Sequence, residues 1–429
     1  MLFSKSISVA VFLLGTATTL AQIPWIKLTT PTRNNLLSVC FSDSLMGWAA
    51  GSRGTIIRTN DGGSSWSMQQ VDTTANIVEI FMLNQNVGWA LSPLVVFDST
   101  FFFGTQIFKT SNGGLEWSQE FFPDYLFYTI TFVDSLHGWM GGEFGALFGT
   151  SDGGINWSPA NVQQILFPID KIRFFSPDYG LASGGQIDRA ALIWRTENGG
   201  GDWSVDLIGA DRMHDFQFVD SSHIVAVGGG PDDGAAVARS IDYGLTWSYD
   251  FPGIFGIAQA ISFRTSAEAW CPLGFTGSFM VTYDSGATWA EVIPPGAGNP
   301  SIQDIQFTDP RNGYTVGDSG FVYKFNPTSV NVEGPGQSDI IQGSTELLYN
   351  YPNPFNTLTS IMYGLSRVNR VSLKVYDMLG REVKTLVDGI EQPGQRSVEF
   401  DGSALGSGLY FCRMLTEDRV QTRKLLLLR

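Results

Sequence analysis

Short apolar runs and polar turns alternate along most of this chain and recur at a nearly constant spacing. Typical units are FSDSLMGWAAG at residues 41–51 and FMLNQNVGWAL at residues 81–91. Apolar runs of this length, bounded by Gly, Asn, Asp and Ser, indicate short β-strands joined by tight turns. The high content of Gly (49 residues) and Trp (12 residues) agrees with a turn-rich, all-β protein.

The repeating unit is about 44 residues long and ends in Ser/Thr-x-Asp/Asn-x-Gly-x-x-Trp. Six copies are present. Their acid or amide residue and their Trp are Asp61 and Trp66, Asn112 and Trp117, Asp152 and Trp157, Asn198 and Trp203, Asp242 and Trp247, and Asp284 and Trp289. Repeats of this length indicate a solenoid, an array or a propeller, in which each unit buries its apolar face against the next.

A seventh unit, residues 306–325, has the apolar run but no Trp after it. Trp25 lies 41 residues before Trp66, which is close to one repeat length. We therefore expect the N-terminal strand around Trp25 to supply the outer strand of the last unit. Circular closure of this kind removes open sheet edges and predicts a seven-bladed β-propeller over residues 22–330.

Each repeat turn has a local physical explanation. The Asp or Asn side chain accepts hydrogen bonds from N–H groups of its own turn, and the Gly permits a backbone conformation that other residues avoid. The Trp then packs into the blade. Each turn offers one carboxylate at most, and two of the six have Asn instead. We therefore predict no metal at these turns, and no motif predicts a cofactor.

The first 21 residues have the three parts of a secretory signal peptide. Lys5 gives a positive start, residues 7–14 are apolar, and Thr19-Leu20-Ala21 is a suitable cleavage site. No later stretch is long and apolar enough for a transmembrane helix. We expect an exported protein, and the three cysteines, Cys40, Cys271 and Cys412, to be small buried side chains rather than a disulfide framework.

Charge divides the mature chain into two parts. Residues 22–330 carry 14 basic and 30 acidic side chains, whereas residues 347–429 carry 11 basic and 8 acidic ones. The segment between them, 331–346, contains Gly, Pro and Ser and is predicted to be a linker. A net charge of -15 argues against nucleic acid as a partner. Alternation in residues 361–375 predicts a small immunoglobulin-like β-sandwich at the C-terminus.

The repeats resemble the Asp-box, or bacterial-neuraminidase, repeats. The longer unit, with Gly-Trp ahead of the turn, is similar to the propellers of photosystem II assembly factors. The resemblance covers about 300 residues. It implies the propeller fold but says little about function, because functional sites are added to a fold independently.

Residues 347–429 resemble the type A C-terminal sorting domain of type IX secretion. The resemblance includes VYDMLGREV, the basic and apolar end, and a sorting motif made of Tyr351, Pro352, Asn353, Pro354, Phe355 and Asn356. It implies export through both membranes of a Bacteroidota-like bacterium by the type IX machinery. It also implies that the tail is usually removed, and that the protein is anchored at the cell surface or released.

The central channel of the propeller is the first candidate site. When the seven inner strands are aligned, one register is mostly polar, and period-two alternation places it toward the channel. The candidate ligand-binding residues there are Glu79, Lys171, Arg173, Asp215 and Asp304. A second candidate is an aromatic patch in or near a loop of the second unit, formed by Phe101, Phe102 and Phe103.

A sialidase-like site would need several Arg side chains converging on one carboxylate. Here the basic residues before the turns fall at equivalent positions around a ring: Arg58, Lys109, Arg195, Arg239 and Lys324. We therefore expect a monomeric, non-enzymatic binding or scaffold module for a glycan or protein ligand. The alternative is a glycoside hydrolase that uses channel carboxylates, Glu79 with Asp215 or Asp304. Adhesion through the aromatic patch is the third possibility.

Overall fold

The computed structural model describes residues 25–97, 101–163, 165–293, 300–326 and 346–427, the last with gaps at 352–354, 356, 366, 379, 393 and 417–419. The predicted signal peptide, residues 331–345 of the predicted linker, and Pro352, Asn353, Pro354 and Asn356 of the sorting motif lie outside the described residues.

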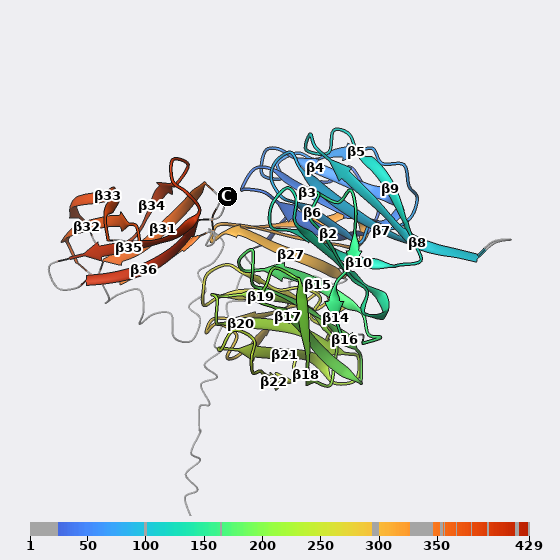
Figure 1. Cartoon of the computed structure of the whole chain (residues 1–429). Helices are drawn as coiled ribbons and strands as arrows, with labels where there is room; N and C mark the ends of the chain where they lie inside the picture. Colours follow the sequence, from blue (N-terminus) through green and yellow to red (C-terminus); the bar gives the residue numbers. More distant parts are fainter. Residues whose placement is uncertain are drawn as a thin grey trace, which may run out of the picture.

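The described part of residues 25–326 folds into seven sheets arranged around a centre (Figure 1). Blade 1 contains β2 (Leu36–Phe41), β3 (Gly47–Gly51), β4 (Thr55–Thr59) and β5 (Ser67–Gln69). Blade 2 contains β6 (Glu79–Met82), β7 (Gly88–Phe97), β8 (Phe101–Thr110) and β9 (Ser118–Pro123). Blade 3 contains β10 (Phe127–Phe132), β11 (Gly138–Gly142), β12 (Leu147–Thr150) and β13 (Ser158–Pro159).

Blade 4 contains β15 (Ile169–Phe174), β16 (Gly180–Gln186), β17 (Ala190–Thr196) and β18 (Asp202–Gly209), and β14 (Asn161–Val162) pairs parallel with β18. Blade 5 contains β19 (Met213–Phe218), β20 (Ile224–Gly230), β21 (Gly234–Ser240) and β22 (Ser248–Asp250). Blade 6 is β23 (Ser262–Phe263), β24 (Ala269–Pro272), β25 (Phe279–Thr282) and β26 (Ala290–Val292). Blade 7 is β27 (Ile302–Asp309), β28 (Asn312–Gly317), β29 (Phe321–Phe325) and β1 (Trp25–Lys27). The helical turns are η1 (Ser52–Gly54), η2 (Glu143–Gly145) and η3 (Asp318–Gly320).

Blade 7 joins the two ends of the propeller. Strand β1 pairs antiparallel with β29, with Trp25 opposite Phe325. The Trp25 ring lies 5.7 Å from Trp270 and 5.6 Å from Phe279, both in blade 6, and 5.4 Å from Phe325 in blade 7. The N-terminal strand therefore completes the last sheet and also fills the space between two blades.

The repeat turns are held by their own side chains. In the first turn, Thr59 Oγ1 donates to Asp61 Oδ1 at 2.8 Å and accepts from the Gly63 N–H at 2.9 Å. Asp61 also accepts from the N–H and hydroxyl of Ser65, at 2.9 and 2.6 Å. The hydrogen bonds from Ser65 and Thr59 lower the pKa of Asp61 to about 2. Asn112 replaces Asp in the second turn and still accepts from the Glu116 N–H at 2.9 Å.

The ring of basic side chains ties adjacent blades together. Lys109 Nζ donates to Gly153 O at 2.7 Å, Arg195 Nε donates to Tyr243 O at 3.1 Å, and Lys324 Nζ donates to Gly62 O at 2.9 Å. Each acceptor is the backbone carbonyl of the residue that directly follows the Asp in the repeat turn of the next blade. For these three of the five basic residues, the contact explains why a basic side chain precedes the turn, and this role is structural.

Aromatic stacking adds to the contacts between blades. The second strand of one blade places an aromatic ring on the inner-strand Phe of the next. Trp89 stacks on Phe132 with ring centroids 3.6 Å apart, and Trp139 stacks on Phe174 at 4.0 Å. These rings are buried or half-buried, so the burial of apolar surface stabilises the interfaces between blades.

Residues 346–427 form two further sheets, which confirms the all-β prediction. One contains β30 (Glu346–Tyr351), β31 (Leu358–Leu365) and β34 (Gly394–Asp401), and the other contains β33 (Glu382–Glu391), β32 (Asn369–Tyr376), β35 (Gly408–Leu415) and β36 (Val420–Leu427). Both contribute to one core that includes Ile361, Leu373, Phe400 and Phe355 of the sorting motif. The immunoglobulin-like topology stays a prediction. Cys40, Cys271 and Cys412 are free thiols, and the last two are buried.

Candidate functional site

The inner strands of five blades carry a β-bulge near the start of the strand. The pairing register shifts around the extra residues Leu37, Tyr128, Asp170, His214 and Gln303. All five line a pocket of about 270 Å³ at the centre of the propeller. A bulge turns an extra side chain out of the normal alternation. In β15, β19 and β27 two consecutive residues of the strand therefore line this channel pocket.

Glycines opposite the bulges allow this geometry. A Cβ on a glycine of the second strand would lie about 2 Å from the backbone carbonyl oxygen of the residue just before the facing inner strand; this holds for Gly51, Gly142, Gly184, Gly228 and Gly317. For Gly228 that oxygen belongs to Arg212, at 1.9 Å. A glycine at the end of each second strand is therefore the sequence signal for the bulge beside it.

The predicted channel residues meet in this pocket. Glu79, Lys171, Asp215 and Asp304 line it, together with Ala260 at the equivalent register of blade 6. Arg173 lies two residues after Lys171 in β15. Its Nη2 is 2.8 and 3.0 Å from the two carboxylate oxygens of Asp215 in the next blade. It binds the carboxylate of a lining residue and is not itself part of the lining.

Several lining residues were missed by the sequence alignment. These are Tyr128, Asp170, Arg212, His214, Gln259 and Gln303. Strict period-two alternation places the residue before Lys171, Asp215 or Asp304 on the opposite face of the strand. At Tyr128, Asp170, His214 and Gln303 the bulge overrides that alternation, and the glycines opposite it are the pattern that would have shown it. Arg212 and Gln259 lie just before the strands of blades 5 and 6, outside the aligned registers.

Many of the polar side chains accept hydrogen bonds from backbone N–H groups at the edge of a neighbouring inner strand. Asp304 Oδ2 accepts from the Val39 N–H at 2.8 Å, and Asp215 Oδ2 accepts from the Ile261 N–H at 3.0 Å. Ser38 does the same for the Ile80 N–H at 3.2 Å. Because a buried N–H without a partner is costly, part of the polarity of the channel is structural.

Ion pairs neutralise most of the remaining charge. Lys171 Nζ lies 2.8 and 3.0 Å from the two carboxylate oxygens of Glu79 across the channel. Arg212 forms an ion pair with Asp170 from the adjacent blade, and His214 Nδ1 lies 3.4 Å from the same carboxylate. The pocket therefore presents paired charges from several blades, as a site for a polar ligand would.

The pKa values follow from burial and pairing. Burial raises the pKa of Glu79, and the Lys171 ammonium acts in the opposite direction. Burial also raises the pKa of Asp304, against the influence of Lys171 and of the Val39 N–H. Burial alone would raise the pKa of Asp170, but the hydrogen bonds from Arg212 and His214 lower it. The carboxylates with raised pKa values are thus held by a cation or by backbone N–H groups.

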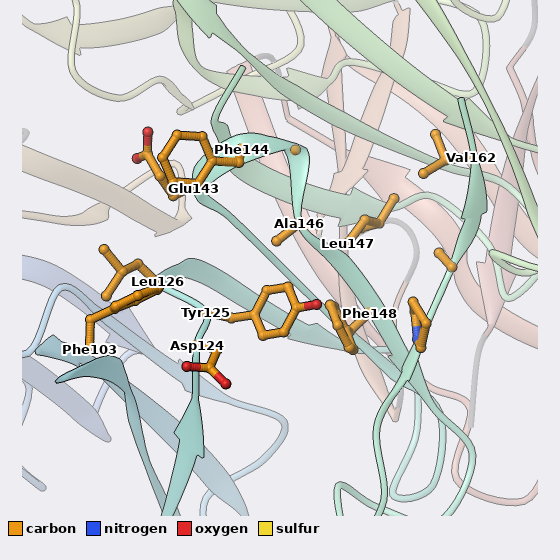
Figure 2. A pocket seen from close by; sticks show the side chains of 13 residues that line it. Phe103, Asp124, Tyr125, Leu126, Glu143, Phe144, Ala146, Leu147, Phe148 and Val162 are labelled. Atoms are coloured by element: carbon orange, nitrogen blue, oxygen red, sulfur yellow. The ribbon is translucent and has the colours of Figure 1, made fainter. Parts of the chain in front are cut away.

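A second hollow lies between blades 2 and 3 (Figure 2). This groove of about 340 Å³ is lined by Phe103, Tyr125, Phe144 and Phe148 among others. Figure 2 shows the Tyr125 ring beside that of Phe148, and the two centroids are 4.8 Å apart. Phe144 lies in η2 with a φ of 55°, and its side chain is 61% exposed. Most residues that line the groove are apolar, Asp124 and Glu143 add polar groups, and the groove is open to solvent.

The predicted aromatic patch lies beside this groove. Phe101, Phe102 and Phe103 are in β8, which pairs with β7 along its whole length. Residues 98–100 lie outside the described part. Phe101 and Phe102 are 62% and 44% exposed, whereas Phe103 lines the groove. Other aromatic residues of this stretch, Phe122 and Phe127, pack into the core between blades 2 and 3.

One hydrogen bond connects the two hollows. The Tyr128 hydroxyl, from the channel lining, donates to Glu143 Oε2 at 2.5 Å, and Glu143 lines the groove. Burial, followed by this hydrogen bond, raises the pKa of Tyr128. The channel pocket and the apolar groove therefore adjoin, and together they offer a polar and an apolar subsite.

The C-terminal part of the chain matches a known sorting family. Residues 350–428 match the secretion system C-terminal sorting domain. The match indicates type IX secretion to the cell surface or the extracellular space, with handling by that machinery. In the described part of the chain no helix has the length and apolarity needed to cross a membrane.

The propeller is similar to photosystem II assembly factors. Residues 17–119 match the family described as photosynthesis system II assembly factor YCF48. The photosystem II assembly lipoprotein Ycf48 of Synechococcus sp. (strain CC9902) is 25% identical over 324 residues, which cover 70% of this chain and 88% of that protein. These matches confirm a propeller of this kind.

Two solved structures share the fold. One is YCF48 bound to D1 peptide, with a TM-score of 0.56 and 20% identity, over 71% of this chain and 97% of that one. The other is YCF48 from Cyanidioschyzon merolae, with a TM-score of 0.56 and 19% identity, over 72% of this chain and 100% of that one. At this level of identity the likeness supports the seven-bladed architecture alone.

Proposed function

We propose that this protein is a non-enzymatic binding module that holds a segment of a partner protein outside the cell. The observation that carries the proposal is the adjoining pair of hollows, one polar and one apolar, linked by Tyr128 and Glu143. A peptide segment has both the backbone and charged groups that suit the channel and the apolar side chains that suit the groove.

A peptide fits the channel better than a glycan does. Sugars are usually bound by stacking on exposed aromatic faces. Among the described residues that line the channel pocket, the aromatic rings are those of Tyr128 and His214, and the remainder are mainly carboxylate, cationic and amide side chains. The similar YCF48 propeller has been solved with a D1 peptide bound, which supports the same ligand class here.

The hydrolase alternative is less well supported. A glycosidase needs one protonated carboxyl as the acid and a free carboxylate as nucleophile or base. Both oxygens of Glu79 are held by Lys171, both oxygens of Asp215 accept backbone N–H groups, and so do both oxygens of Asp304. Groups fixed in this way suit a rigid binding surface.

Binding to a phage-displayed library of linear peptides tests the proposal. The mature chain is immobilised, the selected peptides are synthesised, and their affinities are measured by calorimetry. Gln259→Trp should fill the channel pocket and weaken binding by at least about tenfold. Leu207→Trp adds the same aromatic group at an exposed position of β18 and serves as the matched control.

Three results are informative. Peptides that bind wild type and Leu207→Trp equally, but not Gln259→Trp, support the channel as the site. Selected peptides that bind all three variants equally show that the channel is not used. Retention of polysaccharides without any peptide binding would replace the protein ligand with a glycan.

A further inference from the structure

Three turns of blades 4 and 5 bring carboxylates together outside the channel. Asp188 is in the turn between β16 and β17, Asp211 is in the connection between β18 and β19, and Asp233 is in the turn between β20 and β21. One carboxylate oxygen from each residue lies within 4.8 Å of the other two. This group is called the acidic triad below.

Asp211 is the buried member of the acidic triad and is 0% exposed. Its Oδ1 accepts from the Asp188 N–H at 2.7 Å, and its own N–H donates to the Tyr249 hydroxyl at 3.0 Å. Its Oδ2 is also buried and accepts no hydrogen bond from the described residues. A buried carboxylate oxygen without a partner is costly, and a bound ion is one of the few ways to satisfy it.

No positive side chain compensates the acidic triad. Within the described residues no ion pair involves Asp188, Asp211 or Asp233, and the nearby Arg212 is paired with Asp170. One carboxylate oxygen of each residue therefore faces the other two without an ion-pair partner among the described residues. Asp188 also holds a left-handed backbone, with a φ of 57°. The mutual repulsion in this cluster is the condition that a divalent cation relieves.

We propose that Asp188, Asp211 and Asp233 form a calcium site that joins the turns of blades 4 and 5. The donor set contains only carboxylate oxygens, which suit hard cations better than zinc or copper. The ligands come from three separate turns, and this variable arrangement suits the flexible coordination of calcium better than the strict octahedron of magnesium. Water would complete the oxygen shell.

The position of the site gives it a structural consequence. Asp211 is directly followed by Arg212, and His214 is the bulge residue of β19; both line the channel pocket. An ion bound to Asp211 would hold the start of β19 in place. The calcium site is independent of the proposed peptide binding, because its own readouts are metal affinity and thermal stability.

Calorimetry with calcium chloride on the EDTA-treated, full mature chain tests the proposal. The expected result is one calcium ion per chain, with a dissociation constant of about 10⁻⁴–10⁻³ M, as in other extracellular sites. The melting temperature should rise with calcium concentration, because the ion binds only the folded state. Magnesium at the same concentration should give a smaller rise.

Variants separate the site from general charge effects. Asp233→Asn changes an exposed ligand and should weaken calcium binding at least about tenfold without unfolding the protein. Asp206→Asn removes an exposed carboxylate of β18 outside the triad and should bind calcium like wild type. Absence of heat and of a thermal shift up to roughly 10 mM calcium would overturn the proposal. So would an Asp233→Asn variant with wild-type affinity, and an equal response to magnesium would overturn the assignment to calcium.

Discussion

Single residues of this protein often have two roles, one in the fold and one at the surface. Asp215 lines the channel pocket, yet it also accepts the N–H groups of Phe216 and Ile261 and pairs with Arg173. Replacing it would disturb three blades at once. Variants that test binding must therefore be chosen among lining residues such as Gln259, and variants that test stability among the paired ones.

The Lys171–Glu79 pair gives a prediction for stability. Lys171→Met leaves the largely buried Glu79 carboxylate without its cation and should cost about 3–5 kcal/mol in the free energy of unfolding. The double variant Lys171→Met/Glu79→Gln removes both charges and should recover most of that loss. Urea unfolding at neutral pH measures both. Equal stability of the single variant and wild type would show that the pair contributes nothing.

The repeat turns give a prediction for acid stability. Hydrogen bonds lower the pKa of Asp61 and of Asp152 to about 2, against an ordinary value of 3.8. A lowered folded-state pKa stabilises the protein above the unfolded value, and that contribution is lost as the pH falls from about 4 toward 2. The melting temperature of Asp61→Asn should therefore fall less than that of wild type as the pH falls from about 4 toward 2.

Asn already occupies this position in two turns, so Asp61→Asn should fold normally at neutral pH. Asp206→Asn, an exposed carboxylate outside the turns, is the control and should follow wild type. An Asp61→Asn curve that runs parallel to wild type from pH 4 to 2 would contradict the role of the turn.

At the scale of elements, the repeat pattern predicted the strands but not the bulges. The aligned registers identified Glu79, Lys171, Asp215 and Asp304 as neighbours because alternation holds along most of each inner strand. Tyr128, Asp170, His214 and Gln303 were missed because the bulge breaks that alternation. Asp188 and Asp233 lie 45 residues apart, at equivalent turns of two successive repeats. The acidic triad still could not be predicted, since the repeat does not show that Asp211, from the connection between the two blades, lies close to both.

The glycine opposite the bulge of β19 gives a prediction for one element. In Gly228→Ala the new Cβ would lie 1.9 Å from Arg212 O. Relief of the clash requires a shift of β19 or β20 and should cost about 1–3 kcal/mol. Thermal unfolding measures the loss. Gly253→Ala is the control for removing a glycine, because its Cβ would have open space, although its positive φ carries some strain. Unchanged stability in Gly228→Ala would show that the close contact between Gly228 and Arg212 O does not hold the bulge in place.

At the scale of the whole molecule, closure decides whether seven repeats form one body. Strand β1 is only Trp25–Lys27, and most of its packing comes from one side chain. That side chain contacts aromatic rings of both blade 6 and blade 7. The repeat spacing pointed to Trp25 as the missing outer-strand residue, since periodicity is visible in sequence even when the partner is some 300 residues away.

Trp25→Ala tests the role of closure. Removing a buried Trp should cost about 3–5 kcal/mol and should loosen blades 6 and 7 more than blades 2 to 4. Hydrogen exchange read by mass spectrometry resolves the blades. Met68→Ala, an exposed residue of the outer strand of blade 1, is the control. An equal increase in hydrogen exchange in all blades of Trp25→Ala would contradict the prediction that Trp25 acts mainly on blades 6 and 7.

The central claim is that the exported propeller binds a ligand without chemical turnover. The most direct test incubates the mature chain with peptides and polysaccharides and measures retained ligand and released product in the same samples. We predict retention of peptides, weakened by Gln259→Trp, and no released product. Sugar release that Glu79→Gln abolishes would contradict this claim and would make the channel an active site.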